Sequence, residues 1–312
     1  MRPTVRQIDQ IRQLTRGRVQ LDVPLSRLTS FKIGGPADVL VEPGGVEELS
    51  DLMRYLQDQR ISRFLLGAGT NVLFHDAGFR GVVVRTSGLT GLDIQTNDSD
   101  SAMVMAAAGV LLPAVINRTC KQGLSGLEPL WGIPGSFGGA VATNAGSGGV
   151  STGDFLDAVR LVNDAGEQIT VERPDLVYGY RSMQLPERSV VVEAIVRLQP
   201  RDTEAIEADL QEARERRRST QPLNQPCAGC VFKNPSPDNP AGAIIDRLGF
   251  KGVRSGGAMV SSLHANFIVN SAHASASDVL RLIDQIRERV KQAENIDLEL
   301  EIRIIGEQVN DG

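Results

Sequence analysis

Apolar residues recur every third or fourth position over residues 5–14, which is the spacing of one face of a helix. The same spacing returns over residues 46–56. This second segment lies between two short apolar runs, at residues 39–41 and 64–66, that have the length and composition of buried strands. A strand, a helix and a second strand in this order predict a βαβ unit near the start of the chain.

The rest of the chain continues this mixture of strand-like and helix-like segments. Further strands are predicted at residues 82–85, 103–106, 159–162, 168–171 and 190–198, with a hairpin turn at residues 163–166. Further helices are predicted at residues 111–122, 203–219, 241–248 and 279–290. The last strand is predicted at residues 298–304, where polar and apolar residues alternate, so Glu299, Glu301 and Arg303 are expected to share one side.

Residues 123–149 form the segment with the most unusual composition, because glycines and prolines surround the only tryptophan, Trp131. Where Cβ is absent, main-chain amides approach a ligand closely and adopt turns with positive φ, which is how proteins build sites for anions. Linkers that stay disordered are polar, but this segment has one charged residue, Glu128, and several apolar ones. It is therefore predicted to be an ordered ligand-facing loop followed by a short buried helix.

A second glycine-rich turn, GAGTNVL at residues 67–73, follows the second predicted strand. It begins like a dinucleotide-binding fingerprint but has Val72 where the third glycine belongs, and the residues beyond it do not open a helix. A nicotinamide site of the Rossmann type is thus disfavoured. A turn whose amides face a pyrophosphate, with Thr70 and Asn71 adding side-chain hydrogen bonds, remains the better interpretation.

Composition and charge narrow the class of protein. A length of 312 residues favours two or three domains, and a chain that is 41% hydrophobic and 23% charged has the composition of a soluble globular protein. A net charge of −5 gives no reason to expect nucleic acid or an anionic membrane as a partner. No secretory signal or spanning apolar segment is recognisable, so the expected location is the cytoplasm.

The three cysteines suit a reducing compartment. Cys227 and Cys230 form a C-x-x-C motif, but a zinc site needs two more ligands, and neither a second such motif nor a nearby pair of histidines is present. No metal site is therefore expected. Cys227 is the nearest potential disulfide partner of Cys230.

Seven motifs occur in a fixed order along the chain. They are SFKIGGPAD (30–38), GAGTNVL (67–73), GLEPLWGIPGSFGGAVATNAG (126–146), YR (180–181), CVFKNP (230–235), HANFIVN (264–270) and LELEIRIIG (298–306). In this order they resemble the MurB family, the UDP-N-acetylenolpyruvoylglucosamine reductases, and the resemblance covers nearly the whole chain. The short connection after Tyr180 and Arg181 looks like the branch of the family that lacks an extra substrate-covering loop.

The resemblance implies an α+β fold, in which a two-part FAD-binding unit of the vanillyl-alcohol-oxidase (PCMH) type is followed by a C-terminal α/β substrate-binding domain. The expected boundaries are residues 1–82 and 83–200 for the two FAD-binding parts and 201–312 for the substrate domain, whose final strand returns to the active site. The resemblance also implies FAD, NADPH and UDP-N-acetylglucosamine enolpyruvate as cofactor, reductant and substrate.

The chemistry of such a substrate requires a cation and an acid. Hydride delivery to the β-carbon of an enolpyruvyl group leaves negative charge delocalised onto the carboxylate. A guanidinium such as that of Arg181 binds this charge with two parallel hydrogen bonds. By resemblance, Arg181 and Glu301 stabilise the enol form. By periodicity alone, an ion pair between Glu301 and Arg303 on a strand face is the better interpretation.

Cys230 stands where the family usually has a serine. A thiol, with a reference pKa of about 8.5, is a stronger acid than an alcohol, so it is able to protonate the α-carbon. The change also makes the site sensitive to alkylation and oxidation. Without the family, Cys230 reads as a small buried apolar residue.

The resemblance assigns the remaining site residues to three groups. The first cofactor loop contributes Gly67, Gly69, Thr70, Asn71 and Val72. The second contributes Gly132, Ile133, Gly135, Ser136, Gly138, Gly139 and Ala140, with Asn144 and Gly146 near the flavin ring system. The substrate is expected to meet Tyr180, Lys233, Asn234, His264, Asn266 and Arg303.

Two other functions are compatible with part of this pattern. An FAD-dependent oxidase of the same fold acting on an alcohol would keep the flavin, but it would not need an arginine, a glutamate and a thiol where an enolate requires them. A non-enzymatic nucleotide-binding scaffold would use the glycine-rich loops alone. The protein is expected to be a monomer without nucleic-acid or membrane partners.

Overall fold

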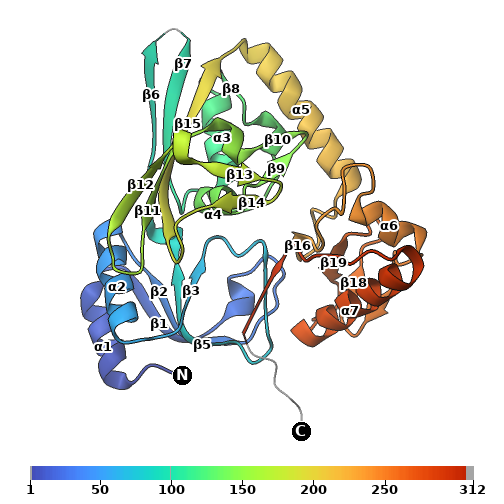
Figure 1. Ribbon diagram of the computed structural model, residues 1–312, viewed down its shortest axis with the longest axis horizontal. Helices are drawn as coiled ribbons and strands as arrows, with labels where there is room; N and C mark the ends of the chain where they lie inside the picture. The colour runs from blue at the N-terminus through green and yellow to red at the C-terminus, as the bar shows by residue number, and fades with distance from the viewer. Residues whose placement is uncertain (1, 99, 307–312) are drawn as a thin grey trace. The chain divides into compact units, whose positions relative to one another are not determined.

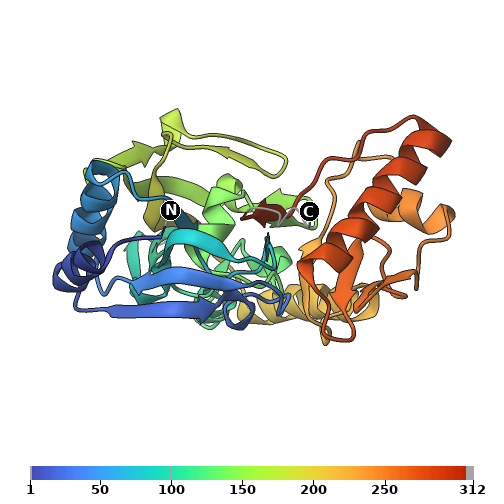
Figure 2. The same cartoon turned by 90° about the horizontal axis from the view of Figure 1, so that it is seen from below.

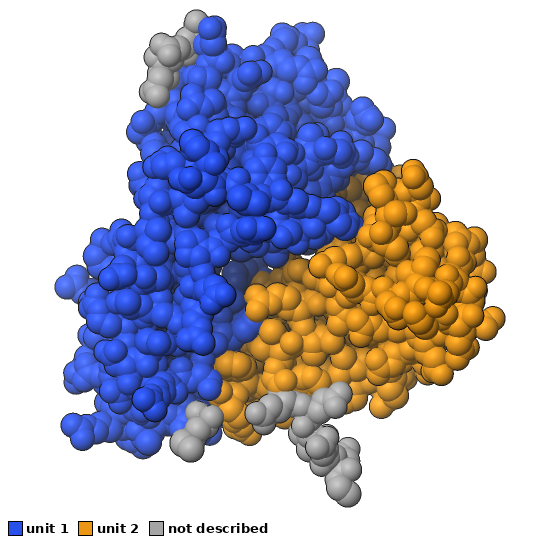
Figure 3. Space-filling model, viewed as in Figure 1, with its two compact units in different colours: residues 1–21, 38–68, 81–216 blue, residues 22–37, 69–80, 217–312 orange. Residues whose placement is uncertain are grey.

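The computed structural model describes residues 2–98 and 100–306 of the chain. Over these residues the chain forms two compact units, and each is built from segments far apart in the sequence. Unit 1 contains residues 1–21, 38–68 and 81–216, and unit 2 contains residues 22–37, 69–80 and 217–312; Figure 3 colours them separately. The three domains proposed from the sequence remain a prediction. None of the helices in the described ranges combines the length and the apolar character needed to cross a membrane.

The first sheet has the order β1-β2-β5-β3, from β1 (Arg18–Pro24), β2 (Pro36–Glu42), β5 (Phe79–Arg85) and β3 (Arg63–Leu66). The predicted strand, helix and strand are confirmed as β2, α2 (Val46–Asp58) and β3, although β5 lies between the two strands in the sheet. The apolar faces of α2 and α1 (Val5–Leu14) join β2 and β5 in one buried core. Figure 2 shows the two helices next to each other beside the sheet.

A larger sheet of unit 1 is antiparallel throughout its main path, in the order β12-β11-β15-β7-β6. Its strands are β6 (Leu92–Asp98), β7 (Ser101–Ala107), β11 (Leu156–Val162), β12 (Gln168–Glu172) and β15 (Val190–Pro200), with β8 (Leu124–Ser125) paired to β15. The neighbouring strands β6, β7 and β15 are easy to follow in Figure 1. The predicted hairpin around residues 163–166 is confirmed as β11 and β12.

Short elements complete unit 1. The helices α3 (Leu112–Cys120) and α4 (Phe137–Ala142) contribute to the same core. The two-stranded ribbons are β9 (Gly146–Ser147) with β10 (Val150–Ser151) and β13 (Val177–Gly179) with β14 (Ser182–Gln184). The 3-10 turns are η2 (Thr86–Gly88), η3 (Glu128–Leu130), η4 (Thr152–Phe155) and η5 (Arg173–Asp175). Helix α5 (Thr203–Thr220) runs from unit 1 into unit 2.

Unit 2 has its own apolar core, built between a four-stranded sheet and two helices. The sheet order is β16-β19-β18-β17, from β16 (Cys227–Cys230), β19 (Phe267–Asn270), β18 (Ala258–Val260) and β17 (Arg254–Ser255). The helices are α6 (Ala241–Arg247) and α7 (Ala276–Glu294), and η1 (Leu25–Arg27) lies in the early segment of the unit. β4 (Val72–Phe74) pairs in parallel with β20 (Arg303–Ile305).

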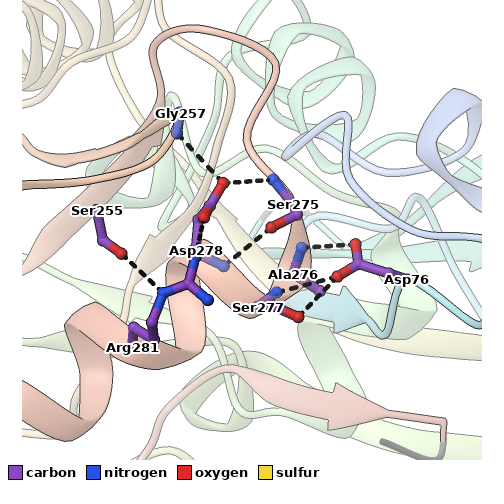
Figure 4. A network of polar contacts seen from close by, with 8 residues as sticks. All are labelled: Asp76, Ser255, Gly257, Ser275, Ala276, Ser277, Asp278 and Arg281. Atoms are coloured by element: carbon purple, nitrogen blue, oxygen red, sulfur yellow. Dashed lines mark hydrogen bonds and ion pairs between the residues drawn. The ribbon is translucent and has the colours of Figure 1, made fainter. Parts of the chain in front are cut away.

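A carboxylate from residues 69–80 of unit 2 holds the start of α7 (Figure 4). The carboxylate of Asp76 accepts hydrogen bonds from the amides of Ala276 at 2.7 Å and Ser277 at 3.1 Å and from the Ser277 hydroxyl at 3.0 Å. Amides in the first turn of a helix have no partner within the helix, so an acceptor there is stabilising. Asp76 thereby ties the residues after β4 to the helix that covers the sheet.

The alternating segment at residues 298–304 is not one strand, and that prediction was wrong. Its first part bonds to the segment after β16: the Lys233 amide donates to the carbonyl oxygen of Glu299 at 2.9 Å, and the Glu301 amide donates to that of Val231 at 2.8 Å. From Arg303 onward the chain changes partner and pairs with β4. Alternation specifies an extended chain with two faces, but it does not specify a single hydrogen-bonding neighbour.

Candidate active site

The glycine-rich segment at residues 123–149 folds as predicted: a loop leads into the short buried helix α4. The amides of Phe137 and Gly138 donate to the carbonyl oxygens of Val110 and Ala108 at 2.7 and 3.0 Å. A Cβ atom added at Gly138 would lie 2.5 Å from the Cβ of Ala108. This glycine is therefore required for close packing, and its amide is already used within the protein.

Amides immediately before α4 remain available. The Gly139 amide donates to the Ser136 hydroxyl at 3.3 Å, but the amides of Gly135 and Ser136 donate to no acceptor within residues 2–98 and 100–306. The first loop reaches this place, because a Cβ atom added at Gly67 would lie 2.4 Å from the Ser136 oxygen. A turn whose Gly135 and Ser136 amides have no acceptor within the described residues, beside a glycine without an obstructing side chain, fits the pyrophosphate of a dinucleotide such as FAD.

The Arg181 side chain lies in unit 1, beside the end of the same stretch. Arg181 is the second residue of the tight turn between β13 and β14, and it adopts a positive φ of 52°. Its Nη1 atom donates to the carbonyl oxygen of Gly146 at 3.0 Å, and its guanidinium carbon lies 5.4 Å from the centre of the Tyr180 ring. Tyr180 itself is 56% exposed. The turn thus presents a guanidinium and an aromatic ring together.

The side chain of Asn144 is bonded to the protein at both ends. Its Nδ2 atom donates to the carbonyl oxygen of Gly179 at 2.7 Å, and its Oδ1 atom accepts from the Gly153 amide at 2.8 Å. Gly153 was not among the residues predicted from the sequence. A Cβ atom there would lie 2.6 Å from the Tyr178 ring and 2.9 Å from the Asn144 oxygen, so only glycine allows this contact.

The second half of the first loop belongs to unit 2. Gly69 has a φ of 70°, its carbonyl oxygen accepts from the Ser30 amide at 3.0 Å, and an added Cβ atom would lie 2.2 Å from the carbonyl oxygen of Leu28. The Asn71 side chain donates to the carbonyl oxygen of Glu301 at 3.1 Å, and the Asn71 carbonyl oxygen accepts from the Arg303 amide at 3.0 Å. The loop therefore binds directly to the C-terminal segment.

Cys230 ends β16 just after a bulge. Cys227 pairs with Val269 and Cys230 with Phe267, so three steps on β16 match two on β19, and the extra residue is accommodated where Gly229 has a φ of 80°. Bulges of this kind redirect a side chain at functional sites. The Ser30 hydroxyl donates to the carbonyl oxygen of Cys227 at 2.6 Å. Both cysteines are partly buried and lie outside any disulfide of the described residues, and burial raises the pKa of the Cys227 thiol.

The segment that carries Glu301 is bonded to the main chain just after Cys230. The Glu301 amide donates to the carbonyl oxygen of Val231, the residue that follows Cys230. Because Asn71 holds the carbonyl of Glu301, three motifs that are separated by up to 230 positions in the sequence meet within unit 2. Main-chain hydrogen bonds therefore bring together the segments that carry Cys230 and Glu301 within unit 2, and Arg181 belongs to unit 1.

The predicted substrate residues of unit 2 are already engaged within the unit. Lys233 forms an exposed ion pair with Glu299 at 3.2 Å, and the Asn234 oxygen accepts from the Ala241 amide at the start of α6 at 3.1 Å. Asn266 is buried, and its side chain accepts from the Phe232 amide at 2.9 Å and donates to the Phe232 carbonyl oxygen at 2.8 Å.

His264 packs within the protein. Its Nδ1 atom accepts from the Asn266 amide at 3.2 Å, and its ring meets the ring of Phe267 edge to face, with centroids 4.9 Å apart. Burial lowers the pKa of the imidazole, and the positive charge of Lys251 lowers it further. Both effects disfavour the charged form of the ring. In the described part of the chain, no three metal-ligating side chains cluster.

Two kinds of site residue could not have been found from spacing. Ser30 fixes Cys227 across 197 positions, and Gly153 admits Asn144 and Tyr178 by lacking a side chain. Neither leaves a periodic signal. By contrast, SFKIGGPAD, which contains Ser30, was singled out as a motif without a role for that serine.

Comparisons with known proteins define the class first. Residues 37–172 match the family model described as FAD binding domain, and residues 221–305 match the one described as UDP-N-acetylenolpyruvoylglucosamine reductase, C-terminal domain. The protein is thus a flavin-dependent oxidoreductase with an FAD-binding unit followed by a separate C-terminal domain, and the predicted fold class is confirmed.

The relatives are more specific. The chain is 43% identical to a UDP-N-acetylenolpyruvoylglucosamine reductase from Syntrophus aciditrophicus, with 96% of each chain covered, and 43% identical to one from Carboxydothermus hydrogenoformans, with 91% and 93% covered. The crystal structure of the Thermus caldophilus enzyme superposes with a TM-score of 0.80 at 35% identity, covering 92% of this chain and 99% of that one. The chain belongs to the UDP-N-acetylenolpyruvoylglucosamine reductase family. This assignment favours the reductase over the alcohol oxidase and the scaffold.

Proposed function

We propose that the protein reduces the enolpyruvyl double bond of UDP-N-acetylglucosamine enolpyruvate to give UDP-N-acetylmuramate, a precursor of peptidoglycan, with NADPH as reductant and FAD as cofactor. The observation that supports the residue roles most strongly is the contact between the Glu301 amide and the main chain beside Cys230. This contact supports a shared role for Cys230 and Glu301, because it joins the two segments that carry them through the main chain.

The residues that would hold FAD are the amide-rich loops. Gly67, Gly135 and Ser136 offer main chain to the pyrophosphate, and Gly69, Thr70, Asn71 and Val72 continue the first loop. Gly132, Ile133, Gly138, Gly139 and Ala140 shape the second loop, and Gly146 lies at its end. When bound, FAD supplies hydride transfer between NADPH and the double bond.

Arg181 and Glu301 stabilise the charge that reduction creates. Two electrons and a hydrogen nucleus arrive at the β-carbon as hydride, and the electron pair of the double bond moves toward the carboxylate. Arg181 binds this carboxylate through parallel hydrogen bonds. Glu301 is proposed to donate a hydrogen bond, in its protonated form, to the negative charge that hydride delivery creates.

Cys230 completes the reaction by donating its thiol proton to the α-carbon. The double bond is then fully reduced, the thiolate regains a proton from water, and NADPH has become NADP⁺. Positioned acids accelerate such steps by roughly 10²–10⁴-fold. Tyr180, Lys233 and Arg303 are proposed to meet the substrate, and Asn234, His264 and Asn266 to act through the main chain that they hold.

The protein is proposed to act as a cytoplasmic monomer, without nucleic-acid or membrane partners. The test of the whole proposal is a steady-state assay of purified protein. NADPH oxidation should depend on UDP-N-acetylglucosamine enolpyruvate, and alcohols or oxygen should not replace it. Equal NADPH oxidation in the absence of the enolpyruvyl sugar would contradict the proposal.

A further inference from the structure

Asn144 lies between α4 and the turn that carries Arg181. It is the second residue after the end of α4, is 2% exposed, and adopts a positive φ of 44°. Helices commonly end with a residue in this conformation, and glycine or asparagine supplies it at the lowest cost. The backbone alone would therefore accept glycine, so the choice of asparagine points to its side chain.

Each end of the side-chain amide is bonded to a different segment. It donates to the carbonyl oxygen of Gly179 at 2.7 Å and accepts from the Gly153 amide at 2.8 Å. Gly179 is the last residue of β13, one residue before Tyr180 and two before Arg181. The two hydrogen bonds of the Asn144 side chain thus connect η4, the end of α4 and the Arg181 turn.

The ribbon that carries the turn is short. The β13–β14 ribbon has three residue pairs, from Val177 with Gln184 to Gly179 with Ser182, and Val177 is 52% exposed. A two-stranded hairpin of this length is marginally stable alone. Arg181 also adopts a φ of 52°, a conformation that a non-glycine residue keeps only when its surroundings hold it.

We propose that Asn144 is the positioning residue for Arg181: it fixes the turn so that the guanidinium is held at Gly146 in the orientation that receives the substrate carboxylate. This rests on the proposed role of Arg181, and it replaces the predicted contact between Asn144 and the flavin. Asparagine is required because it combines a left-handed backbone, a donor for Gly179 and an acceptor for Gly153. Aspartate lacks the donor, and glycine lacks both side-chain groups.

The test uses Asn144→Gly, which keeps the backbone conformation and removes only the tether. The matched control is Asn163→Gly, because Asn163 also bonds at both ends, to Glu167 at 2.8 and 2.9 Å, and closes the β11–β12 turn of the same unit without touching a candidate site residue. Bound FAD, reduction by NADPH and oxidation by the enolpyruvyl sugar are measured separately in the holoenzymes. Limited trypsin digestion follows cleavage of the Arg181–Ser182 bond.

Asn144→Gly should retain FAD and be reduced by NADPH at the normal rate. Its reaction with the enolpyruvyl sugar should slow by about 10–100-fold, since misplacement of a catalytic group by about 1 Å costs that much. Cleavage after Arg181 should become faster, and Asn163→Gly should change neither the half-reactions nor that cleavage. The double variant Asn144→Gly with Arg181→Ala should be no slower than Arg181→Ala alone, because the two changes remove the same function.

Three results would overturn the inference: loss of FAD, an equal slowing of both half-reactions, or cleavage after Arg181 at the wild-type rate. The failure of the proposed function is distinguishable. If Arg181→Ala itself reacts normally with the enolpyruvyl sugar, the catalytic role of Arg181 is wrong, and the trypsin digestion still decides whether Asn144 holds the turn.

Discussion

The turn that carries Arg181 and the strand that carries Cys230 are both held by an asparagine whose amide is bonded to the main chain at both ends. In unit 1, Asn144 bonds to the residues around a two-stranded ribbon at the surface. In unit 2, Asn266 bonds twice to Phe232, and its own main chain accepts from the Val231 amide at 2.8 Å. Val231 and Phe232 are almost completely buried in the second core.

The difference lies in how many other contacts support each asparagine. Cys230 belongs to a four-stranded sheet with a core behind it, whereas Arg181 belongs to a ribbon of three residue pairs. Loss of an asparagine should therefore destabilise unit 2 and leave a folded but misaligned unit 1. This contrast makes stability the sensitive measurement for one region and reaction rate the sensitive measurement for the other.

The largest effect in unit 1 should come from Arg181→Ala. Loss of a group that stabilises developing charge costs about 10²–10³-fold in rate. The rate that should fall is that of the reaction with the enolpyruvyl sugar, which is measured by rapid mixing of reduced enzyme with that substrate. The rate of reduction by NADPH should be unchanged. Arg181→Lys should recover only part of the rate because an ammonium does not form the paired hydrogen bonds. Full activity of Arg181→Ala would show that the Arg181 turn of unit 1 does not contribute to the reaction.

In unit 2, Asn266→Ala should reduce the free energy of unfolding. The Phe232 amide and carbonyl oxygen would both lose their partner in the core, and each buried unsatisfied group costs about 1–3 kcal/mol. Denaturant unfolding of Asn266→Ala beside Asn144→Gly measures the contrast directly. Equal destabilisation by the two changes would show that the two regions are supported alike.

Asn71→Ala should have a smaller effect, because Glu301 keeps other anchors. The lost bond from the Asn71 side chain to the Glu301 carbonyl oxygen contributes about 0.5–1.5 kcal/mol. The Glu301 amide stays bonded to Val231, and β20 stays paired with β4. Oxidation by the enolpyruvyl sugar should therefore slow by no more than about tenfold. A loss as large as that of Arg181→Ala would mean that Asn71, and not the strand pairing, sets the position of Glu301.

The smallest effect is a pH dependence of unit 2. The folded protein lowers the pKa of His264 below its ordinary value of 6.5, because of burial and the charge of Lys251, while Asp246 opposes the change. The unfolded chain therefore binds the proton more readily, so this stability is present above pH 6.5 and is lost as the pH falls through the lowered value. As the pH falls over that range, the thermal unfolding temperature of the wild type should decrease more than that of His264→Gln. Parallel curves would contradict this.

The sequence predicted the strongly periodic elements and the residues that share motifs. Apolar spacing located α1, α2 and α7, and glycine composition located the loop before α4. It did not predict the partners of extended segments: residues 298–304 alternate like a strand but bond first to Val231 and then to β4. Nor did it predict that Asn71 bonds to Glu301 and Asn144 to Gly179. The type of a polar residue does not identify a hydrogen-bond partner 230 or 35 positions away.

The most direct test of the central claim is an anaerobic two-step titration of Cys230→Ala beside the wild type and Cys230→Ser. NADPH is added first and UDP-N-acetylglucosamine enolpyruvate second, and flavin absorbance is followed. The account predicts that all three proteins are bleached by NADPH, that wild type and Cys230→Ser recover their colour with the sugar, and that Cys230→Ala stays bleached. Recovery of colour by Cys230→Ala at the wild-type rate would show that the thiol does not deliver the proton.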